Sequence, residues 1–197
     1  YKSGFSQFDI QIDDNIFKNF KIKLSGEHNV LNCLAAVIIA LKLGIPESII
    51  LNAISTFKGV KRRFSYVINS KSIILIDDYA HHPEEISKIH KSLRIIYPNE
   101  KILAIFQPHL FSRTINLIDD FANELSKFDN VILLEIYPAR EEPISGVSSS
   151  LLLEKIRLDN KTICQKSEIS HSILNIGNKI NVLMGAGDIA LSLIHIS

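Results

Sequence analysis

The chain has 197 residues, of which 46% are hydrophobic and 22% are charged, and its formal net charge is +1. This composition is typical of globular proteins, and the length suffices for one well-cored domain plus part of another. Because the basic residues are scattered, apart from Lys61-Arg62-Arg63, and because no run approaches the roughly 20 apolar residues of a membrane span, we expect no nucleic-acid partner and no membrane insertion.

The first part of the chain predicts a hairpin followed by two helices. Residues 5–24 alternate between apolar and polar side chains on either side of a turn at 13–15 that contains only Asp and Asn. The spacing becomes helical over 29–43, where Gly44 ends the pattern, and a second helix is predicted over about 47–57.

After Arg63 short apolar runs alternate with amphipathic stretches of helical spacing. The predicted strands cover 73–76, 102–106, 131–134, 162–164 and 182–184. The predicted helices cover about 83–97, 115–127, 148–157 and 168–176, with another beginning near 188. Near-continuous apolar strands separated by helices indicate an α/β fold with a parallel sheet covered on both faces. We therefore expect a Rossmann-like domain over 63–197 and assign 1–62 to the incomplete end of another domain.

Polar side chains follow three consecutive predicted strands, in loops at 77–83, 107–113 and 137–143. Each loop also contains proline. In open parallel sheets ligands bind outside the carboxyl ends of the strands. We therefore expect the three loops to converge on one site.

Each loop also has a purely structural interpretation. The first combines two carboxylates, Tyr79 and two His before Pro83; it fits a capped helix start, contacts to substrate or nucleotide or, less well, a metal site. In the second loop Arg113 suits bidentate recognition of a carboxylate or phosphate, or is simply exposed. In the third, Arg140 either joins the site or pairs with the glutamates beside it.

Two further patterns bear on nucleotide binding. Asn29 and Asn32 share a helix face and either read the edge of a purine or cap the helix. Residues 185–190 match G-x-G-x-x-A, but they fall in the last strand-helix unit, so a tight turn is favoured over a dinucleotide site. The sequence contains no G-x-x-x-x-G-K-[ST], so these residues carry no Walker-type phosphate loop.

The cysteines indicate the compartment in which the protein resides, and the chain ends bear on the extent of the given sequence. Cys33 and Cys164 lie far apart in apolar surroundings, and we expect both to be buried thiols of a cytoplasmic protein. The start has no initiator Met and no signal peptide, so we expect the chain to begin within a longer protein. The apolar tail 191–197 resembles translated adapter sequence, and we expect it not to be native.

Six motifs, in order along the chain, resemble those of the Mur ligase family, and within it the ligases that join L-alanine to UDP-N-acetylmuramate. They are Gly26–Asn32, Gly59–Phe64, Asp77–Pro83, Phe106–His109, Tyr137–Pro143 and Met184–Asp188. The resemblance implies that residues 1–62 end a central ATP-binding domain and that 63–197 form the Rossmann-like C-terminal domain.

The chemistry implied by the resemblance is ATP-dependent amide formation through an acyl phosphate, in peptidoglycan precursor synthesis. The phosphate loop, the catalytic lysine and the ligands of Mg²⁺ would lie upstream. We therefore expect no catalytic residue and no metal ligand in this chain, and no activity from it alone.

Residue roles also follow from the resemblance. Asn29 and Asn32 would contact adenine, with His28 beside them, while Arg63 and Asp78 would meet the ribose and phosphates. The residues that would face the incoming L-alanine are Tyr79, His81, His109, Arg113 and Arg140.

One departure leaves alternatives open. The family often has an arginine where this chain has Leu110, so Arg113 would bind the amino-acid carboxylate alone or with help from Arg140. Three alternatives remain: a related ligase that recycles a whole tripeptide, an NAD-type oxidoreductase domain, and a nucleotide-binding module without ligase activity.

Overall fold

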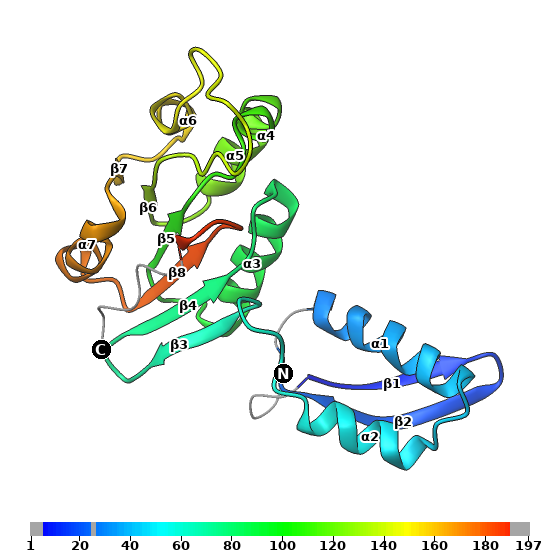
Figure 1. Ribbon diagram of the computed structural model, residues 1–197. Coiled ribbons are helices and arrows are strands. Elements are labelled where there is room, and N and C mark those ends of the chain that lie inside the picture. The colour runs from blue at the N-terminus through cyan, green and yellow to red at the C-terminus, as the bar shows by residue number, and fades with distance from the viewer. Residues whose placement is uncertain (1–5, 25–26, 190–197) are drawn as a thin grey trace. The chain divides into compact units, whose positions relative to one another are not determined.

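The computed structural model describes residues 6–24 and 27–189, apart from the side chain of His28. The chain divides into two compact units, and the boundary falls between Lys61 and Arg62 (Figure 1). The tail 191–197 lies outside the described residues, so the expectation that it is not native stays a prediction.

The smaller unit begins with the predicted hairpin. Strand β1 (Ser6–Ile12) pairs antiparallel with β2 (Asn15–Ile22), and Asp13 in the turn between them has a φ of 52°. A bulge interrupts the pairing where Asn19, at a φ of 70°, donates its backbone N–H to Asp9 Oδ1 at 2.9 Å. Asn tolerates this left-handed conformation better than most residues, which explains its place there.

Two helices complete this unit, as predicted. Helix α1 (Glu27–Lys42) begins two residues before the predicted start, and α2 (Glu47–Thr56) follows Pro46, which precedes its first turn. The hairpin and the helices share a small core of buried side chains: Ile10, Phe20, Ile22, Cys33, Val37 and Ile50.

The larger unit contains a six-stranded sheet in the order β3-β4-β8-β5-β6-β7. The strands are β3 (Ser65–Asn69), β4 (Ile74–Asp78), β5 (Ile102–Phe106), β6 (Asn130–Leu133), β7 (Lys161–Ile163) and β8 (Ile180–Met184). All neighbours pair in parallel except β3, which runs antiparallel to β4. The predicted parallel α/β sheet is therefore confirmed, and β3 is an edge strand that the sequence pattern did not reveal.

The helices of the larger unit follow the predicted alternation, with one correction. They are α3 (Pro83–Ile96), α4 (Phe111–Asn116), α5 (Ile118–Leu125), α6 (Ser149–Lys155), the 3₁₀ turn η1 (Lys166–Glu168) and α7 (Ile169–Ile176). The single helix predicted over 115–127 is wrong, because the chain becomes helical at Phe111 and Leu117 separates two short helices.

Both faces of the sheet are covered. Helices α3, α5 and α6 pack on one face, which centres on Phe106 and Phe121. Helix α7 packs on the other face through Ile169 and Ile173 (Figure 1). Because the inner part of the sheet is buried on both sides, the central strands β5 and β8 are largely apolar, and the carboxyl ends of the parallel strands are left to carry loops.

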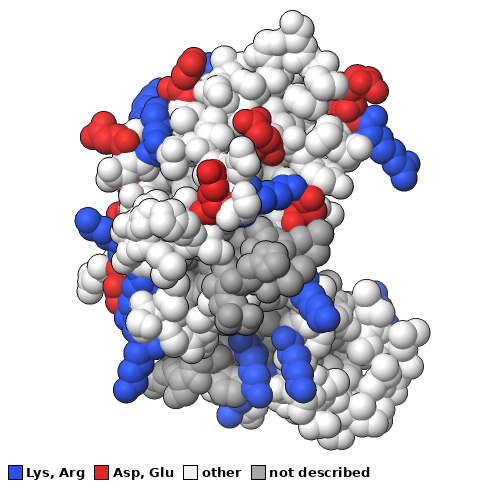
Figure 2. All heavy atoms as spheres, turned by 60° about the vertical axis from the view of Figure 1, so that its left-hand side comes forward, with Lys and Arg blue, Asp and Glu red and all other residues white. Residues whose placement is uncertain are grey.

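The surface and the two thiols complete the description. None of the helices in the described residues has the length and apolar character needed to span a bilayer. On the face drawn in Figure 2, acidic side chains lie beside basic ones over the larger unit. Cys33 is buried, as expected, but Cys164 is only half-buried, because the short edge strand β7 leaves its end partly uncovered.

Candidate functional site

The loops that follow β5 and β6 are held together by backbone hydrogen bonds. The Tyr137 N–H donates to the Pro108 carbonyl at 2.8 Å, and the Leu110 N–H donates to the Tyr137 carbonyl at 2.9 Å. His109 and Tyr137 thus form an isolated parallel bridge beyond the ends of the two strands. This pairing makes one surface of two loops that are 30 residues apart in the sequence, about 107–110 and 137–140.

A row of rings extends this surface to the loop after β4. Tyr79 lies edge-on to His81 with a centroid distance of 5.3 Å, and the His81 ring lies 6.2 Å from that of His109. His109 in turn stacks on Tyr137 at 5.5 Å with only 20° between the ring planes. The three loops predicted to converge therefore do meet, through side chains from each of them.

Cationic groups stand at both ends of the row. The guanidinium carbons of Arg62 and Arg63 lie 5.0 and 5.4 Å from the centre of the Tyr79 ring. At the other end the Lys166 ammonium lies 5.8 Å from the centre of the Tyr137 ring. Cations over ring faces are attracted electrostatically, so these contacts hold the outer rings in place.

Arg113 lies beside the middle of the row. Its Nη1 is 3.5 Å from His109 Nδ1. Burial keeps the pKa of His109 below its usual value, with further lowering by electrostatic interaction with Arg113 and His81, while Glu141 opposes this shift. His109 is therefore neutral at neutral pH, and the guanidinium next to it stays available to an anionic group such as a carboxylate.

The two adjacent histidines of the first loop have different surroundings. His81 Nδ1 lies 2.9 Å from the Tyr79 carbonyl and 3.3 Å from Glu85 Oε2. Both of these partners can only accept, so the Nδ1 atom carries a proton and Nε2 faces elsewhere. His82 instead caps α3, accepting the Glu84 N–H at 3.4 Å, and Pro83 occupies the first helical position.

This separation bears on the metal interpretation of the first loop. His81 and His82 turn to different partners, and the part of the chain that the structure describes contains no group of three or more His, Cys, Asp or Glu suited to a metal ion. The first loop is thus a helix start that also delivers His81 and Tyr79 to the row of rings.

Asp78 is engaged by the backbone around it. It is 3% exposed; Oδ2 accepts the Phe64 N–H at 2.7 Å, and Oδ1 accepts the Ala80 N–H at 2.8 Å. Burial raises the pKa of Asp78 to about 6, against the opposing effect of these two N–H donors. Both oxygens therefore tie the turn that carries Arg63 to the first loop, rather than facing solvent.

Arg62 contacts the row of rings and the glycine turn after β8, and the sequence analysis did not single it out. Its guanidinium donates to the Gly187 carbonyl at 3.0 Å and to the Gly185 carbonyl, and its Nε lies 3.5 Å from Asp77 Oδ2. The available signal was its central place in the short basic cluster at 61–63.

The backbone of the glycine turn after β8 forms hydrogen bonds within the larger unit. Its carbonyls accept from Arg62, and the Gly185 N–H donates to the Asp78 carbonyl at 3.2 Å. A Cβ at Gly187 would lie 2.7 Å from Gln107 Oε1 and 2.8 Å from Tyr137 Cγ, so glycine lets the Tyr137 ring pack on the turn. The residues of the G-x-G-x-x-A match that the structure describes therefore form a tight turn at the end of β8, which agrees with the favoured interpretation.

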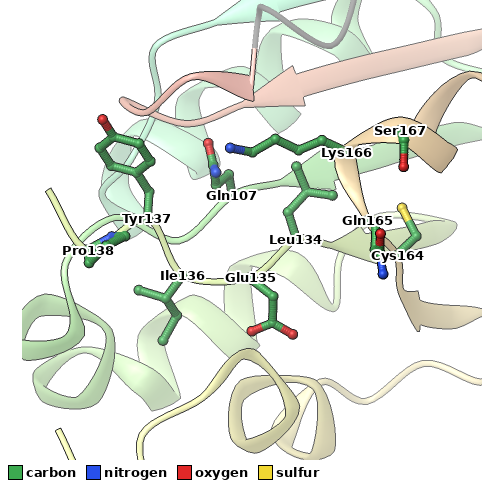
Figure 3. Close-up of a pocket in the computed structure, with 10 residues that line it drawn as sticks. All are labelled: Gln107, Leu134, Glu135, Ile136, Tyr137, Pro138, Cys164, Gln165, Lys166 and Ser167. Atoms are coloured by element: carbon green, nitrogen blue, oxygen red, sulfur yellow. The ribbon is translucent and has the colours of Figure 1, made fainter. Parts of the chain in front are cut away.

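A pocket of about 360 Å³ adjoins the row of rings at Tyr137 (Figure 3). It lies between the loop after β6 and the start of η1, where Lys166 pairs with Asp188. The residues that line it are Gln107, Leu134, Glu135, Ile136, Tyr137, Pro138, Cys164, Gln165, Lys166 and Ser167. No sequence pattern predicted this pocket, because its lining comes from three separate segments.

Three predicted residues belong to the smaller unit. Asn29 and Asn32 occupy the first turns of α1 in the smaller unit, where Asn29 is half-buried and Asn32 is exposed. The side chain of His28, predicted beside them, lies outside the described residues.

Arg140 is exposed and forms no ion pair with any residue that the structure describes. The alternative in which it pairs with neighbouring glutamates is therefore not observed. Glu141 bonds to Ser112 instead.

Comparisons with known proteins agree with this architecture. A family described as Mur ligase, glutamate ligase domain, matches residues 62–192. The chain is 50% identical over 188 residues to a UDP-N-acetylmuramate–L-alanine ligase of Christiangramia forsetii, covering 95% of this chain and 42% of that protein. It is 45% identical over 195 residues to the ligase of the same name from Flavobacterium psychrophilum, covering 99% of this chain and 44% of that protein.

Solved structures give the same result. The crystal structure of the UDP-N-acetylmuramate-alanine ligase of Thermotoga maritima superposes with a TM-score of 0.75 at 28% identity, covering 92% of this chain and 40% of that one. The chain thus spans about two fifths of the length of the relatives it matches. From the match over residues 62–192 and the identity to these relatives, the chain belongs to the Mur ligase family.

Proposed function

We propose that this chain works as the C-terminal part of a cytoplasmic, ATP-dependent ligase that joins L-alanine to UDP-N-acetylmuramate during peptidoglycan precursor synthesis. The names of the relatives support this choice of substrates. The observation that carries it is the Arg113 guanidinium, which lies beside a neutral His109 where the three loops meet.

The reaction has two steps. The lactyl carboxylate of the muramic acid attacks the γ-phosphorus of ATP, which forms an acyl phosphate and releases ADP. The amine of L-alanine then attacks the acyl carbon, the C–O bond to phosphate breaks, and the amine loses a proton. Inorganic phosphate leaves as the amide forms. Such chemistry depends on positioning and on stabilising charge.

The described residues do not fit a Mg²⁺ site, because they contain no suitable cluster of acidic or histidine side chains. The sequence also has no phosphate loop. We infer that the ATP phosphates and Mg²⁺ are held upstream of this chain.

For the acceptor, Arg113 binds the carboxylate of L-alanine, while Tyr79, His81 and His109 form the wall against which the amino acid lies. The row of rings supports this assignment, because its members are fixed by contacts to one another. Arg140, which is exposed and unpaired among the described residues, is free to reach the same carboxylate.

For the nucleotide, we propose that Asn29 and Asn32 read the adenine, with His28 beside them. Arg63 contacts the ribose and phosphate region. Asp78 takes part by holding the backbone at Phe64, since both of its oxygens are already bonded. In this proposal residues 1–62 form the C-terminal end of the ATP-binding domain, and residues 63–197 form the C-terminal domain of the protein.

The direct test is phosphate release by the full-length protein with ATP, Mg²⁺, UDP-N-acetylmuramate and a panel of acceptors. Release that depends on L-alanine is expected, with weaker signals for serine and glycine. Release only with the tripeptide would assign the protein to the recycling ligases. No release with any acceptor would contradict the proposed activity.

Replacing Arg113 tests the acceptor site. Arg113→Ala in the full-length protein removes a charge-assisted contact, so we expect the KM for L-alanine to rise about 10- to 100-fold while the KM for ATP changes less than about twofold. Arg157→Ala, which removes an exposed arginine elsewhere in the unit, is the matched control. Equal rises in both KM values would contradict a carboxylate role for Arg113.

A further inference from the structure

Helix α4, which carries Arg113, begins without a cap of its own. The residue before it, Leu110, has a φ of 72° and an apolar side chain that cannot accept a hydrogen bond. The first N–H groups of any helix have no partner within the helix and need an acceptor from elsewhere. The first turn of α4 therefore depends on another segment.

Glu141, in the loop after β6, supplies that acceptor. Its Oε2 accepts the Ser112 N–H at 3.0 Å, and its Oε1 accepts the Ser112 hydroxyl. The two residues are 29 positions apart in the sequence. One carboxylate thus binds the residue next to Arg113 through both of its oxygens.

The loop that carries Glu141 is itself fixed. The Glu141 N–H donates to the Pro138 carbonyl at 2.9 Å, which closes a turn, and Ala139 within that turn has a φ of 52°. Tyr137, one residue before the turn, is tied to Pro108 and Leu110 by the two backbone hydrogen bonds described above. A carboxylate on such a turn can hold α4 in a single place relative to β5.

The carboxylate of Glu141 also interacts electrostatically with Arg113 and His109. Hydrogen bonds from the Ser112 side chain and backbone keep the pKa of Glu141 below its usual value, and the charge of Arg113 adds to this effect. The carboxylate is therefore charged at neutral pH, and its field also reaches His109.

We propose that Glu141 is a positioning residue: by binding Ser112 it fixes the first turn of α4 and so aims the Arg113 guanidinium at the acceptor carboxylate. This inference rests on the proposed function, because it assigns to Glu141 the orientation of the residue that binds L-alanine. Glu141 itself touches no substrate in this scheme; it acts through Arg113.

The kinetic test uses the full-length protein and a double-mutant cycle. Glu141→Ala is expected to raise the KM for L-alanine about tenfold and to leave the KM for ATP within about twofold. Glu141→Gln, which keeps one acceptor oxygen, should recover part of the affinity. Glu142→Ala is the matched control, because Glu142 is the exposed neighbour on the same loop.

The cycle decides whether Glu141 acts through Arg113. In an Arg113→Ala background, Glu141→Ala should change the KM for L-alanine less than about twofold, since the group it positions is gone. Independent, additive effects of the two substitutions would overturn the proposal. So would a Glu142→Ala effect as large as that of Glu141→Ala.

A second measurement does not need activity. Hydrogen exchange of the Ser112 amide should be about tenfold faster in Glu141→Ala than in the original protein and unchanged in Glu142→Ala. Equal exchange rates of the Ser112 amide in Glu141→Ala and Glu142→Ala would contradict the proposed role of Glu141 in fixing the first turn of α4. Faster exchange without any L-alanine-dependent turnover in the unaltered protein would instead count against the proposed function alone.

Discussion

At the scale of single residues, Asp78 couples stability to pH. Its carboxylate is nearly inaccessible to water, and two backbone N–H groups are the partners that replace that water. Burial favours the neutral acid, so the pKa in the folded protein, about 6, exceeds the ordinary value of 3.8. Between these two values the folded state binds more protons than the unfolded state.

The first prediction follows from this difference. As the pH rises from about 4 to about 6, the free energy of unfolding should fall by about 2–3 kcal/mol through Asp78. Asp78→Asn, which cannot titrate, should lose this component of the pH dependence, although it also loses one acceptor. Chemical denaturation followed by circular dichroism at several pH values measures it. Asp159→Asn, at an exposed carboxylate, is the control, and equal slopes for Asp78→Asn and the original chain would contradict the prediction.

At the scale of elements, α6 begins in a way that can be tested directly. Ser148 has extended backbone angles, and its hydroxyl accepts the Leu151 N–H at 3.2 Å. Ser148→Ala should therefore lower the free energy of unfolding by about 1 kcal/mol. Ser150→Ala, at an exposed serine in the first turn of the same helix, should cost far less. Denaturant titration of the two variants measures their free energies of unfolding. Equal decreases for Ser148→Ala and Ser150→Ala would contradict a capping role for Ser148.

Comparison of the predicted and observed elements shows which of them the sequence pattern can predict. Strands buried on both faces, such as β5 and β8, have continuous apolar runs and were predicted within two residues. Strand β3 was missed because an edge strand with exposed Tyr66 and Val67 lacks that pattern. The start of α4 could not be predicted either, since the acceptor for its Ser112 N–H is Glu141, 29 residues away in the sequence.

The same limit applies to the site. The loops that carry Tyr79, His109 and Tyr137 were predicted from strand ends and polar content alone, and they do meet. Arg62 was missed because its role depends on two carbonyls more than 120 residues away. Contacts of this kind follow from the order of the strands in the sheet, which the one-dimensional pattern does not contain.

At the scale of the whole molecule, this chain alone is expected to lack the ligase activity proposed for the full-length protein. Because it contains no phosphate loop, the isolated 197-residue chain should show no L-alanine-dependent phosphate release above background. The full-length protein under the same conditions is the positive control. Detectable acceptor-dependent hydrolysis by the isolated chain would mean that the ATP phosphates bind to residues present here.

The place of β8 in the sheet has a consequence for synthesis on the ribosome. It lies between β4 and β5, yet among the described residues it is the last strand in chain order. Until residues 180–184 have left the exit tunnel, neither β4 nor β5 has its inner neighbour, and both present open hydrogen-bonding edges. The larger unit can therefore close its sheet only after β8 has been synthesised, and a nascent chain paused before that point exposes strand edges that can pair with other chains.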